Sequence, residues 1–409
     1  MEKIIDASGT DTGYDYNVIG GTTGWRIGVY FREVKKTLKI LQLTAHFRPN
    51  IGGVETHLDD LVEVLIKRGF DVDVLTYQPL TTDVFWRGVE KNKNIMVIRI
   101  PWITGLFYKL VSFPILEFFY LLPGLFFITP LILIWKNSDV IHAHGLVAGF
   151  VGVFWGKIFN KRTVVSMHSI YSFPKKGFYR EFAGWIFKNA NFCLGLSKQA
   201  AAEIRSLGVP VSKIGDFIYW IDLEKFKRVE DAKSQLGWKD KFTVLFVGRL
   251  VKEKGVLELL ESVQEWDRSI NLKIIGSGPL EGEVKKAASG YRNIELIGVI
   301  DQDKLSLYYS GSDILIVPSV SEEGFGRVIL ESLACGTPVI GANRGAISEA
   351  MDESVGKLID VSAEKIKDAV LYFYKNSDRL KKIAGNCRKF AERRYPEKNV
   401  EAIIKTYQA

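Results

Sequence analysis

Two glutamates, Glu323 and Glu331, lie in a glycine-punctuated stretch, SEEGFGRVILESLACGTPVIGA, that ends in a strand-like run. Arg327 stands one helical turn before Glu331, at the spacing of an i,i+4 ion pair. A carboxylate also suits a vicinal diol, since each hydrogen bond to a charged group contributes roughly 1.5 to 3 kcal/mol. The stretch therefore predicts either a helical ion pair or two carboxylates that bind a ribose and a hexose on either side of a diphosphate. On the second interpretation the partners of the glutamates are hydroxyls rather than cations.

Two cations, Arg249 and Lys254, follow the apolar run FTVLFVG in the segment GRLVKEKG. A guanidinium fork and an ammonium group five positions apart can converge on one dianionic group. A solvated basic loop, with Lys252 between them, is the competing interpretation. Gly53 precedes a helical stretch and Gly276 follows a strand-like run. Such glycines allow backbone N–H groups to approach a phosphate, or a turn to admit a planar base, although plain tight turns fit them too.

All five histidines fall in the first half of the chain, most of them near the ends of strand-like runs. His142 and His144, two apart in an extended segment, point to the same side, as two zinc ligands would. No third ligand has a matching spacing. His168, directly after TVVSM, is best placed to contact a substrate hydroxyl or to act as a hydrogen-bond relay. A buried structural imidazole is the alternative for each of them.

The elements that must position these residues alternate between β-rich runs and helical stretches. They begin at Leu38 with LKILQLT, THLDDLVEVLIKRG and DVDVLTY, and the alternation restarts at Phe242 with FTVLFVG. This rhythm predicts an α/β protein of two facing Rossmann-like parallel-sheet domains, with a cleft at the carboxyl ends of the strands. The length of 409 residues exceeds the roughly 250 to 300 residues that one core serves. The expected segments are 1–36, an extension of unknown role, 37–222, 223–393 and 394–409.

Composition narrows the partners and the compartment. A formal charge of +8 favours anionic partners, but scattered Lys and Arg residues without a binding module argue against nucleic acid. The three cysteines lie far apart without CxxC spacing, which predicts a reducing, cytoplasmic setting. The amino-terminal stretch lacks the apolar core of a signal peptide.

One apolar segment, FFYLLPGLFFITPLILIW, carries no charge from Phe118 to Trp135 and meets the length rule for a membrane span. Pro123 and Pro130 are expected to interrupt it, and the flanking strands must lie on one side of any bilayer. An interfacial helix or hairpin is therefore favoured over a span, with a buried helix as the remaining alternative. We expect peripheral membrane association through residues 102–135.

A series of motifs resembles, in the same order, those of the family 4 glycosyltransferases, which are retaining enzymes of the GT-B fold. The resemblance covers about residues 37–409, and its most specific motif has the two glutamates separated by seven residues. The motifs are GGVE at 52–55, IHAH at 141–144, VSMH at 165–168, GRLVKEKG at 248–255, GSGPL at 276–280 and PSVSEEGFGRVILESLACGTPVIG.

The resemblance implies a nucleotide-sugar donor site in residues 223–393. Arg249 and Lys254 match the basic pair on the donor diphosphate. Glu331 matches the ribose-binding glutamate, and Glu323 matches the one that contacts hydroxyls of the transferred sugar. The remaining implied donor contacts come from backbone atoms and pocket shape at Gly53, Gly276, Val299, Phe325 and Gly326.

Residues 37–222 are implied to bind the acceptor. His168 matches the histidine near the anomeric carbon, and His144 is assigned to the acceptor side. The helix within 394–409 resembles the terminal helix that crosses back to the first domain. In the linker, Tyr219-Trp220 precede Ile221-Asp222, where the family usually shows Asn-Gly before Val-Asp.

These implications predict a retaining transferase that moves a hexose or N-acetylhexosamine from a UDP- or GDP-sugar to a membrane lipid or lipid-linked glycan at the inner face of the membrane. HFRPNIGGVETH, similar to phosphatidylinositol N-acetylglucosaminyltransferase catalytic subunits, favours a lipid. No metal or other cofactor is expected, because Asp71, Asp73, Asp301 and Asp303, the two DxD-like pairs, look structural. A same-fold UDP-GlcNAc 2-epimerase and a non-catalytic sugar-nucleotide-binding subunit are the alternatives.

Overall fold

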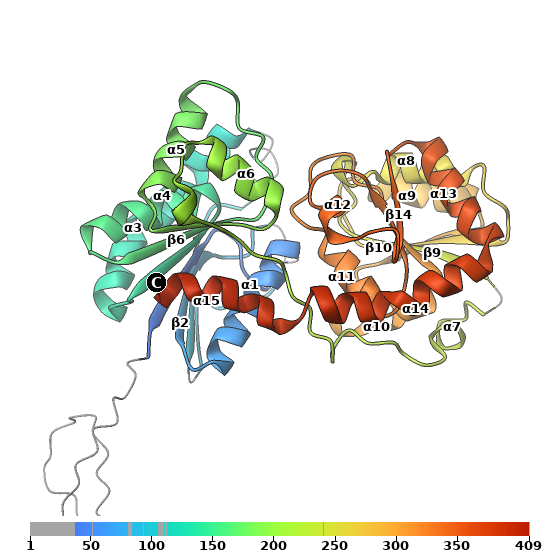
Figure 1. The fold of residues 1–409 in the computed structure, drawn as a ribbon, viewed down its shortest axis with the longest axis horizontal. Coiled ribbons are helices and arrows are strands. Elements are labelled where there is room, and N and C mark those ends of the chain that lie inside the picture. Colours follow the sequence, from blue (N-terminus) through green and yellow to red (C-terminus); the bar gives the residue numbers. More distant parts are fainter. Residues whose placement is uncertain are drawn as a thin grey trace, which may run out of the picture.

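The computed structural model describes residues 37–50, 52–80, 84–92, 94–104, 110, 113–239 and 241–408. The expected extension, residues 1–36, lies outside the described residues, as do 105–109 and 111–112 of the expected membrane segment. The described chain forms two α/β lobes joined by a linker and by a C-terminal helix (Figure 1). The three cysteines are free and buried.

The first lobe is built on an eight-stranded sheet with the order β3-β4-β2-β1-β5-β6-β7-β8. Neighbouring strands pair in parallel, except that β3 runs antiparallel to β4 at one edge. The strands are β1 (Lys39–Thr44), β2 (Asp71–Tyr77), β3 (Val89–Asn92), β4 (Ile95–Ile100), β5 (Val140–His144), β6 (Arg162–Met167), β7 (Phe192–Gly195) and β8 (Ile214–Asp216).

Helices cover both faces of this sheet, because side chains alternate between its faces along each strand. Ile40 and Val72 pack on the face covered by α1 (Gly53–Lys67), whereas Leu41 and Leu43 pack on the opposite face. The helices on that opposite face are α3 (Pro114–Lys136), α4 (Gly145–Ile158), α5 (Phe178–Asn189) and α6 (Lys198–Ser206).

The apolar helix α3 runs unbroken through Pro123 and Pro130, so the expected interruption is wrong. The hydroxyl of Tyr77 donates to the Leu121 carbonyl and accepts from the Leu125 N–H at 3.0 Å. These are the two groups that would bond each other in a regular helix. The tyrosine hydroxyl therefore provides hydrogen-bond partners for backbone groups of α3 near Pro123, where the regular helical hydrogen bonds are disturbed.

A second side chain supplies a missing hydrogen bond near the other proline, Pro130. Pro130 has no N–H for the Phe126 carbonyl, and Trp155 Nε1 of α4 donates to that carbonyl at 2.8 Å. Among the residues that the structure describes, α3 is the helix long and apolar enough to cross a membrane, over Ile115–Lys136. Of its most apolar 18-residue window, 33% is buried inside the protein.

The second lobe is built on a six-stranded parallel sheet with the order β11-β10-β9-β12-β13-β14. Its strands are β9 (Phe242–Val247), β10 (Ile270–Ile275), β11 (Ile294–Gly298), β12 (Ile314–Val317), β13 (Val339–Ala342) and β14 (Gly356–Ile359). Its helices are α7 (Ala232–Gln235), α8 (Val256–Val263), α9 (Glu281–Gly290), α10 (Leu305–Gly311), α11 (Arg327–Ala334), α12 (Ile347–Ala350), α13 (Ala363–Lys375) and α14 (Ser377–Arg394). The predicted pair of parallel-sheet domains is thus confirmed.

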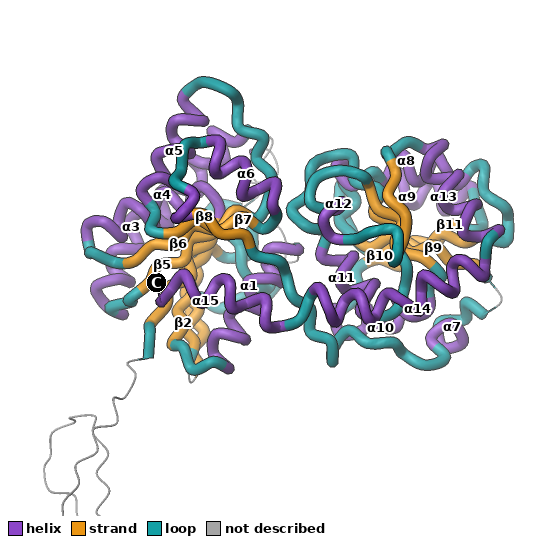
Figure 2. The backbone as a smooth tube through the Cα atoms, in the orientation of Figure 1, coloured by secondary structure: helices purple, strands orange, loops and turns teal. Residues whose placement is uncertain are grey.

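Two segments connect the lobes. The linker follows β8, and its Ile221 N–H donates to the Tyr395 carbonyl at 3.1 Å. After the 3₁₀ turn η4 (Glu397–Val400), α15 (Glu401–Gln408) lies along the first lobe and ends there (Figures 1 and 2). Arg162 of β6 holds it by donating to the Tyr407 carbonyl at 2.7 Å.

Candidate active site

The loops after β6 and β12 meet where the two lobes touch, a contact that we call the interdomain seam. Gly324 lies directly against the carbonyl of His168, and a Cβ at position 324 would come within 2.0 Å of that oxygen. Arg327, at the start of α11, forms an ion pair with Asp60 of α1 at 2.5 Å. The seam therefore joins the glycine-punctuated stretch to the first lobe.

Lys254 and Glu323 meet on the second-lobe side of the seam. Lys254 ends the 3₁₀ turn η2 (Lys252–Lys254) after β9, and its Nζ lies 2.6 Å from Glu323 Oε1. Ser319 Oγ donates to the same carboxylate oxygen. The expectation that Glu323 has no cation for a partner is therefore wrong, because its cation comes from a loop 69 residues away in the sequence.

Arg249 approaches the seam from the end of β9. It is exposed and forms no ion pair with any described residue. Burial lowers the pKa of His46, Glu55 opposes this shift, and the Arg249 charge adds to the lowering, which places Arg249 near the first lobe. Helix α1 begins there at Gly53, and no side chain caps its first N–H groups. A guanidinium and free backbone donors thus lie on two sides of one seam.

Glu331 lies buried one turn into α11. Its Oε2 accepts a hydrogen bond from the Tyr309 hydroxyl at 2.8 Å, and its Oε1 lies 3.2 Å from Arg327 Nε. The i,i+4 pair is therefore present, and Glu331 too has a cation. Burial raises the pKa of Glu331, and Arg327 opposes this shift. Burial by itself lowers the pKa of Arg327, but Asp60 and Glu331 together raise it above its ordinary value.

Three strand ends lie side by side in the second lobe. Gly276, after β10, has φ +138°, and a Cβ there would meet the Gly248 carbonyl oxygen at 1.9 Å. Its N–H bonds to the carbonyl of Gly298, the last residue of β11, at 2.8 Å. Val299 follows with its side chain exposed. At this edge of the sheet the backbone of Gly276 therefore lies against the backbone of Gly248, and a side chain at position 276 would have no room.

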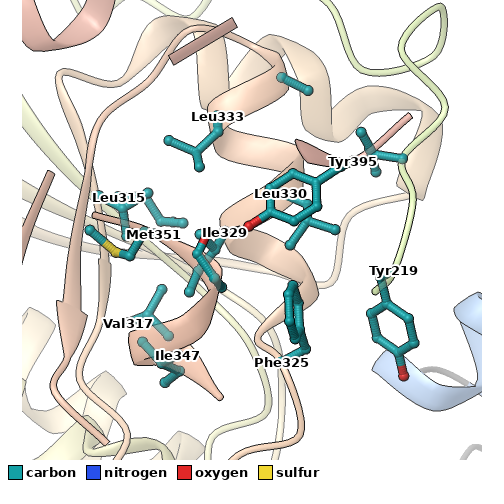
Figure 3. Close-up of a cluster of buried hydrophobic side chains, with 14 of the residues drawn as sticks. Tyr219, Leu315, Val317, Phe325, Ile329, Leu330, Leu333, Ile347, Met351 and Tyr395 are labelled. Carbon is teal, nitrogen blue, oxygen red and sulfur yellow. Dashed lines mark hydrogen bonds between the residues drawn. The ribbon is translucent and has the colours of Figure 1, made fainter. Parts of the chain in front are cut away.

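Phe325 and Gly326 form the corner between the glycine stretch and α11. Phe325 is buried, with its ring centroid 5.9 Å from that of Tyr219 and 5.9 Å from that of Tyr395 (Figure 3). Gly326 has φ +67°, a left-handed conformation that favours glycine. The aromatic contact fixes this corner to the linker between the lobes.

His168 has both ring nitrogens engaged by protein groups. Its Nε2 lies 2.9 Å from His144 Nδ1, and its Nδ1 lies 3.4 Å from the Tyr219 hydroxyl. His144 Nε2 lies 2.7 Å from Gln42 Oε1. Burial lowers the pKa of His168 to about 4 and also lowers that of His144, so both rings are neutral at pH 7. This arrangement fits a hydrogen-bond relay better than a free imidazole that points at a substrate.

One carboxylate of each DxD-like pair lies in a close ion pair with lysine. Asp73 pairs with Lys136 at 3.1 Å, and Asp303 pairs with Lys225 at 2.8 Å. Within the described part of the chain, no group of three or more His, Cys, Asp or Glu side chains is arranged to hold a metal ion.

Sequence reasoning missed several residues that contact the predicted site residues. Gln42 carried a signal, because it is a polar residue inside the apolar strand LKILQLT. Asp60 and Tyr407 carried none, since each looks like an ordinary position on an amphipathic helix and its partner lies far along the chain.

Two family models match the chain, one in each lobe. The model described as "Glycosyltransferase Family 4" matches residues 51–215, and the model described as "Glycosyl transferases group 1" matches residues 228–393. An uncharacterized glycosyltransferase of Methanocaldococcus jannaschii is 25% identical over 397 residues, 91% of this chain and 98% of that protein. The GPI3 subunit of phosphatidylinositol N-acetylglucosaminyltransferase from Saccharomyces cerevisiae is 23% identical over 332 residues, 76% of this chain and 69% of that protein.

Solved structures share the fold. Sucrose-phosphate synthase from Thermosynechococcus elongatus has a TM-score of 0.77 at 23% identity, covering 91% of this chain and 98% of that chain. HepE from Anabaena in complex with UDP has a TM-score of 0.73 at 19% identity, covering 91% and 100%. The two parallel-sheet lobes thus define a protein of the GT-B fold. With both family models matched, the chain belongs to the family 4 glycosyltransferases, which confirms the predicted family and enzyme class.

Proposed function

We propose that the protein transfers a hexose or N-acetylhexosamine from a UDP- or GDP-sugar to a hydroxyl of a membrane lipid or lipid-linked glycan, with retention of configuration. The observation that carries this proposal is the Lys254–Glu323 pair at 2.6 Å, which sets a cation suited to a diphosphate beside a carboxylate suited to sugar hydroxyls. HepE, which was solved with UDP and with UDP-glucose, supports a nucleotide-sugar donor. The match to the GPI3 subunit supports a lipid-linked acceptor.

The donor diphosphate is held by positive charge from both lobes. Arg249 and Lys254 stabilise the charge that develops on the leaving phosphate, because preorganised donors need little reorganisation during the reaction. The N–H groups at the start of α1, beside Gly53, add partial positive charge. No metal is needed in this scheme, since these groups supply the charge.

The sugar and nucleoside lie on either side of the diphosphate. Glu323 accepts hydrogen bonds from hydroxyls of the transferred sugar, next to the backbone N–H groups of Phe325 and Gly326. Glu331 accepts from the ribose, because each of its oxygens retains lone pairs beyond its bond to Tyr309 or Arg327. The base lies against the strand ends at Gly276 and Val299.

The acceptor enters from the first lobe, on the side of His144 and His168. Its hydroxyl oxygen bonds to the anomeric carbon on the face that the diphosphate leaves, and a phosphate oxygen takes the hydroxyl proton. The same face is used for departure and attack, so the configuration is retained. The neutral His168 holds the acceptor side of the seam in place.

The outer surface of the first lobe supports a membrane-bound acceptor. We call the exposed side of α3 and its neighbours the apolar face, and it includes Ile115, Leu116, Phe119, Phe127, Leu131, Ile134 and Trp135 of α3, Ile158 of α4 and Phe178 of α5. Lys136 Nζ lies 4.9 Å from the Trp135 ring centroid, and Lys157 Nζ lies 5.8 Å from that of Trp185. Apolar residues rimmed by such Trp and Lys pairs suit the interface of an anionic leaflet. We therefore place the protein at the inner face of the membrane, as a peripheral protein.

A transfer assay tests the proposed function. Purified protein is mixed with radiolabelled UDP-, GDP- or ADP-sugars and with polyprenyl phosphate or phosphatidylinositol in vesicles. We expect label to enter the lipid from one donor, undiminished by EDTA. Activity lost in EDTA and restored by Mg²⁺ or Mn²⁺ would overturn metal independence. Conversion of UDP-GlcNAc without any acceptor would instead indicate a 2-epimerase.

A vesicle-binding assay tests the apolar face. The double substitution Phe127→Asp and Leu131→Asp removes two exposed side chains whose burial contributes roughly 1.5 to 3 kcal/mol each. We expect co-sedimentation with anionic vesicles to weaken by at least about tenfold. Val211→Asp, at an exposed position of the same lobe outside the apolar face, is the control and should bind as the wild type does. Equal binding by the double variant would contradict this surface.

A further inference from the structure

A row of polar side chains crosses the sheet of the first lobe on the face that receives α15. Gln42 of β1 is paired in register with His142 of β5, and His144 is paired with Ser166 of β6. Side chains two residues apart share a face, so these four point the same way, toward the face on which Ile40 packs. All four are buried, at 6% exposure or less.

Hydrogen bonds join this row to both connections between the lobes. At one end, His168 contacts His144 and the Tyr219 hydroxyl of the linker, as described above. At the other end, the Tyr407 hydroxyl of α15 lies 2.7 Å from His142 Nδ1 and 3.4 Å from Gln42 Nε2. His142 Nε2 completes the row at 2.6 Å from Ser166 Oγ. The linker, through Tyr219, and the terminal helix, through Tyr407, therefore take part in one continuous hydrogen-bond network.

The amide of Gln42 sets the direction of every bond toward His168. Its oxygen can only accept, so His144 Nε2 carries a proton and donates to it. A neutral His144 then accepts at Nδ1, which makes His168 Nε2 the donor of their 2.9 Å bond. His168 is left with an unprotonated Nδ1, into which the Tyr219 hydroxyl donates.

The same amide sets the other branch. Its NH₂ group donates to the Tyr407 oxygen, and the Tyr407 hydroxyl proton is then directed to His142 Nδ1. His142 donates through Nε2 to Ser166. All donors thus follow one order, from Tyr219 through His168, His144, Gln42, Tyr407 and His142 to Ser166. Burial lowers the pKa of each of the three histidines, which keeps the rings neutral as this order requires.

We propose that Gln42 and Tyr407 are positioning residues that fix the tautomer and ring orientation of His168. The inference rests on the proposed place of His168 beside the reacting groups, since that place is what makes its orientation matter. Docking of α15 inserts Tyr407, which orients the Gln42 amide, and the amide orients two imidazoles in turn. The C-terminal helix is therefore part of the site.

Tyr407→Phe removes one hydroxyl and tests this role. With the protein labelled with ¹⁵N at its five histidines, long-range ¹H–¹⁵N NMR reads each tautomer, and single histidine substitutions assign the signals. We expect wild-type His142, His144 and His168 each to carry the proton on Nε2. In Tyr407→Phe the Gln42 amide can reverse, so His168 should populate both tautomers. The kcat should fall on the order of tenfold, with the donor KM unchanged.

Two further variants make the test decisive. Gln42→Leu keeps the size of the side chain but removes the amide, and should give the same loss of a single tautomer. Tyr77→Phe removes a buried hydroxyl from the opposite face of the same sheet, and should leave the tautomers and kcat unchanged. Wild-type His168 protonated on Nδ1, or unchanged tautomers in both network variants, would overturn the proposal. The NMR result stands even if no sugar is transferred, so failure of the proposed function is recognised separately.

Discussion

Lys254→Met is expected to lower kcat by roughly 100- to 1000-fold, the usual cost of removing one preorganised donor to a developing anion. Methionine keeps the length of the side chain but removes the ammonium group, which lies 2.6 Å from Glu323. The loss falls on turnover because the charge on the leaving phosphate is greatest in the transition state. The measurement is steady-state transfer at saturating acceptor, with kcat and the donor KM determined separately.

Lys252→Met is the matched control, because Lys252 starts the same 3₁₀ turn and is exposed. It should transfer sugar at the wild-type rate.

Arg249→Ala should impair donor binding as well as turnover, whereas Glu323→Gln should lower turnover more than donor binding. Equal kcat values for the Lys252→Met and Lys254→Met variants would contradict the assignment of Lys254 to the active site.

Arg327→Met should lower the free energy of unfolding by roughly 3 to 5 kcal/mol, as expected when one partner of a buried ion pair is removed. Arg327 is 6% exposed and joins Asp60 of the first lobe to Glu331 of the second. Without it, the buried carboxylate of Glu331 and the partly buried carboxylate of Asp60 lose their shared cation, and the two lobes lose a contact. Urea denaturation followed by tryptophan fluorescence measures the change.

Arg68→Met provides the comparison for this prediction. Arg68, at the end of α1, also forms an ion pair, at 2.7 Å from Glu401 of α15, but both side chains are more than 40% exposed. Exposed pairs contribute about 0 to 1 kcal/mol, so this variant should be close to the wild type. If both arginine variants lose the same small amount, the buried network does not stabilise the seam as described here. The triple variant with Asp60→Asn and Glu331→Gln should recover part of the Arg327→Met loss.

Local patterns predicted the fold because each strand and helix carries its own periodicity. The runs LKILQLT, DVDVLTY and FTVLFVG form β1, β2 and β9, and the restart at Phe242 marks the second sheet. The continuity of α3 was not predictable in this way. It depends on Tyr77 and Trp155, whose side chains donate hydrogen bonds to carbonyl groups of α3 from other elements of the fold.

The candidate site also has a part that the sequence predicts and a part that it does not. Residue types and spacing singled out Arg249, Lys254 and both glutamates, because charged groups after strand ends are visible in a sequence. The partners of these groups were not visible. The Lys254–Glu323 pair spans 69 residues and the contact of His142 with Tyr407 spans 265. Only the folded arrangement brings such groups together.

Titration of the protein with nucleotides tests most directly the claim that the interdomain seam binds a nucleotide diphosphate sugar. Calorimetry with UDP, GDP, ADP and the corresponding monophosphates gives each affinity without any acceptor. The account predicts that one nucleoside diphosphate binds at least about tenfold more tightly than its monophosphate, and that Arg249→Ala removes this difference. Absence of binding by every nucleotide, or equal affinity for the mono- and diphosphate, would contradict it.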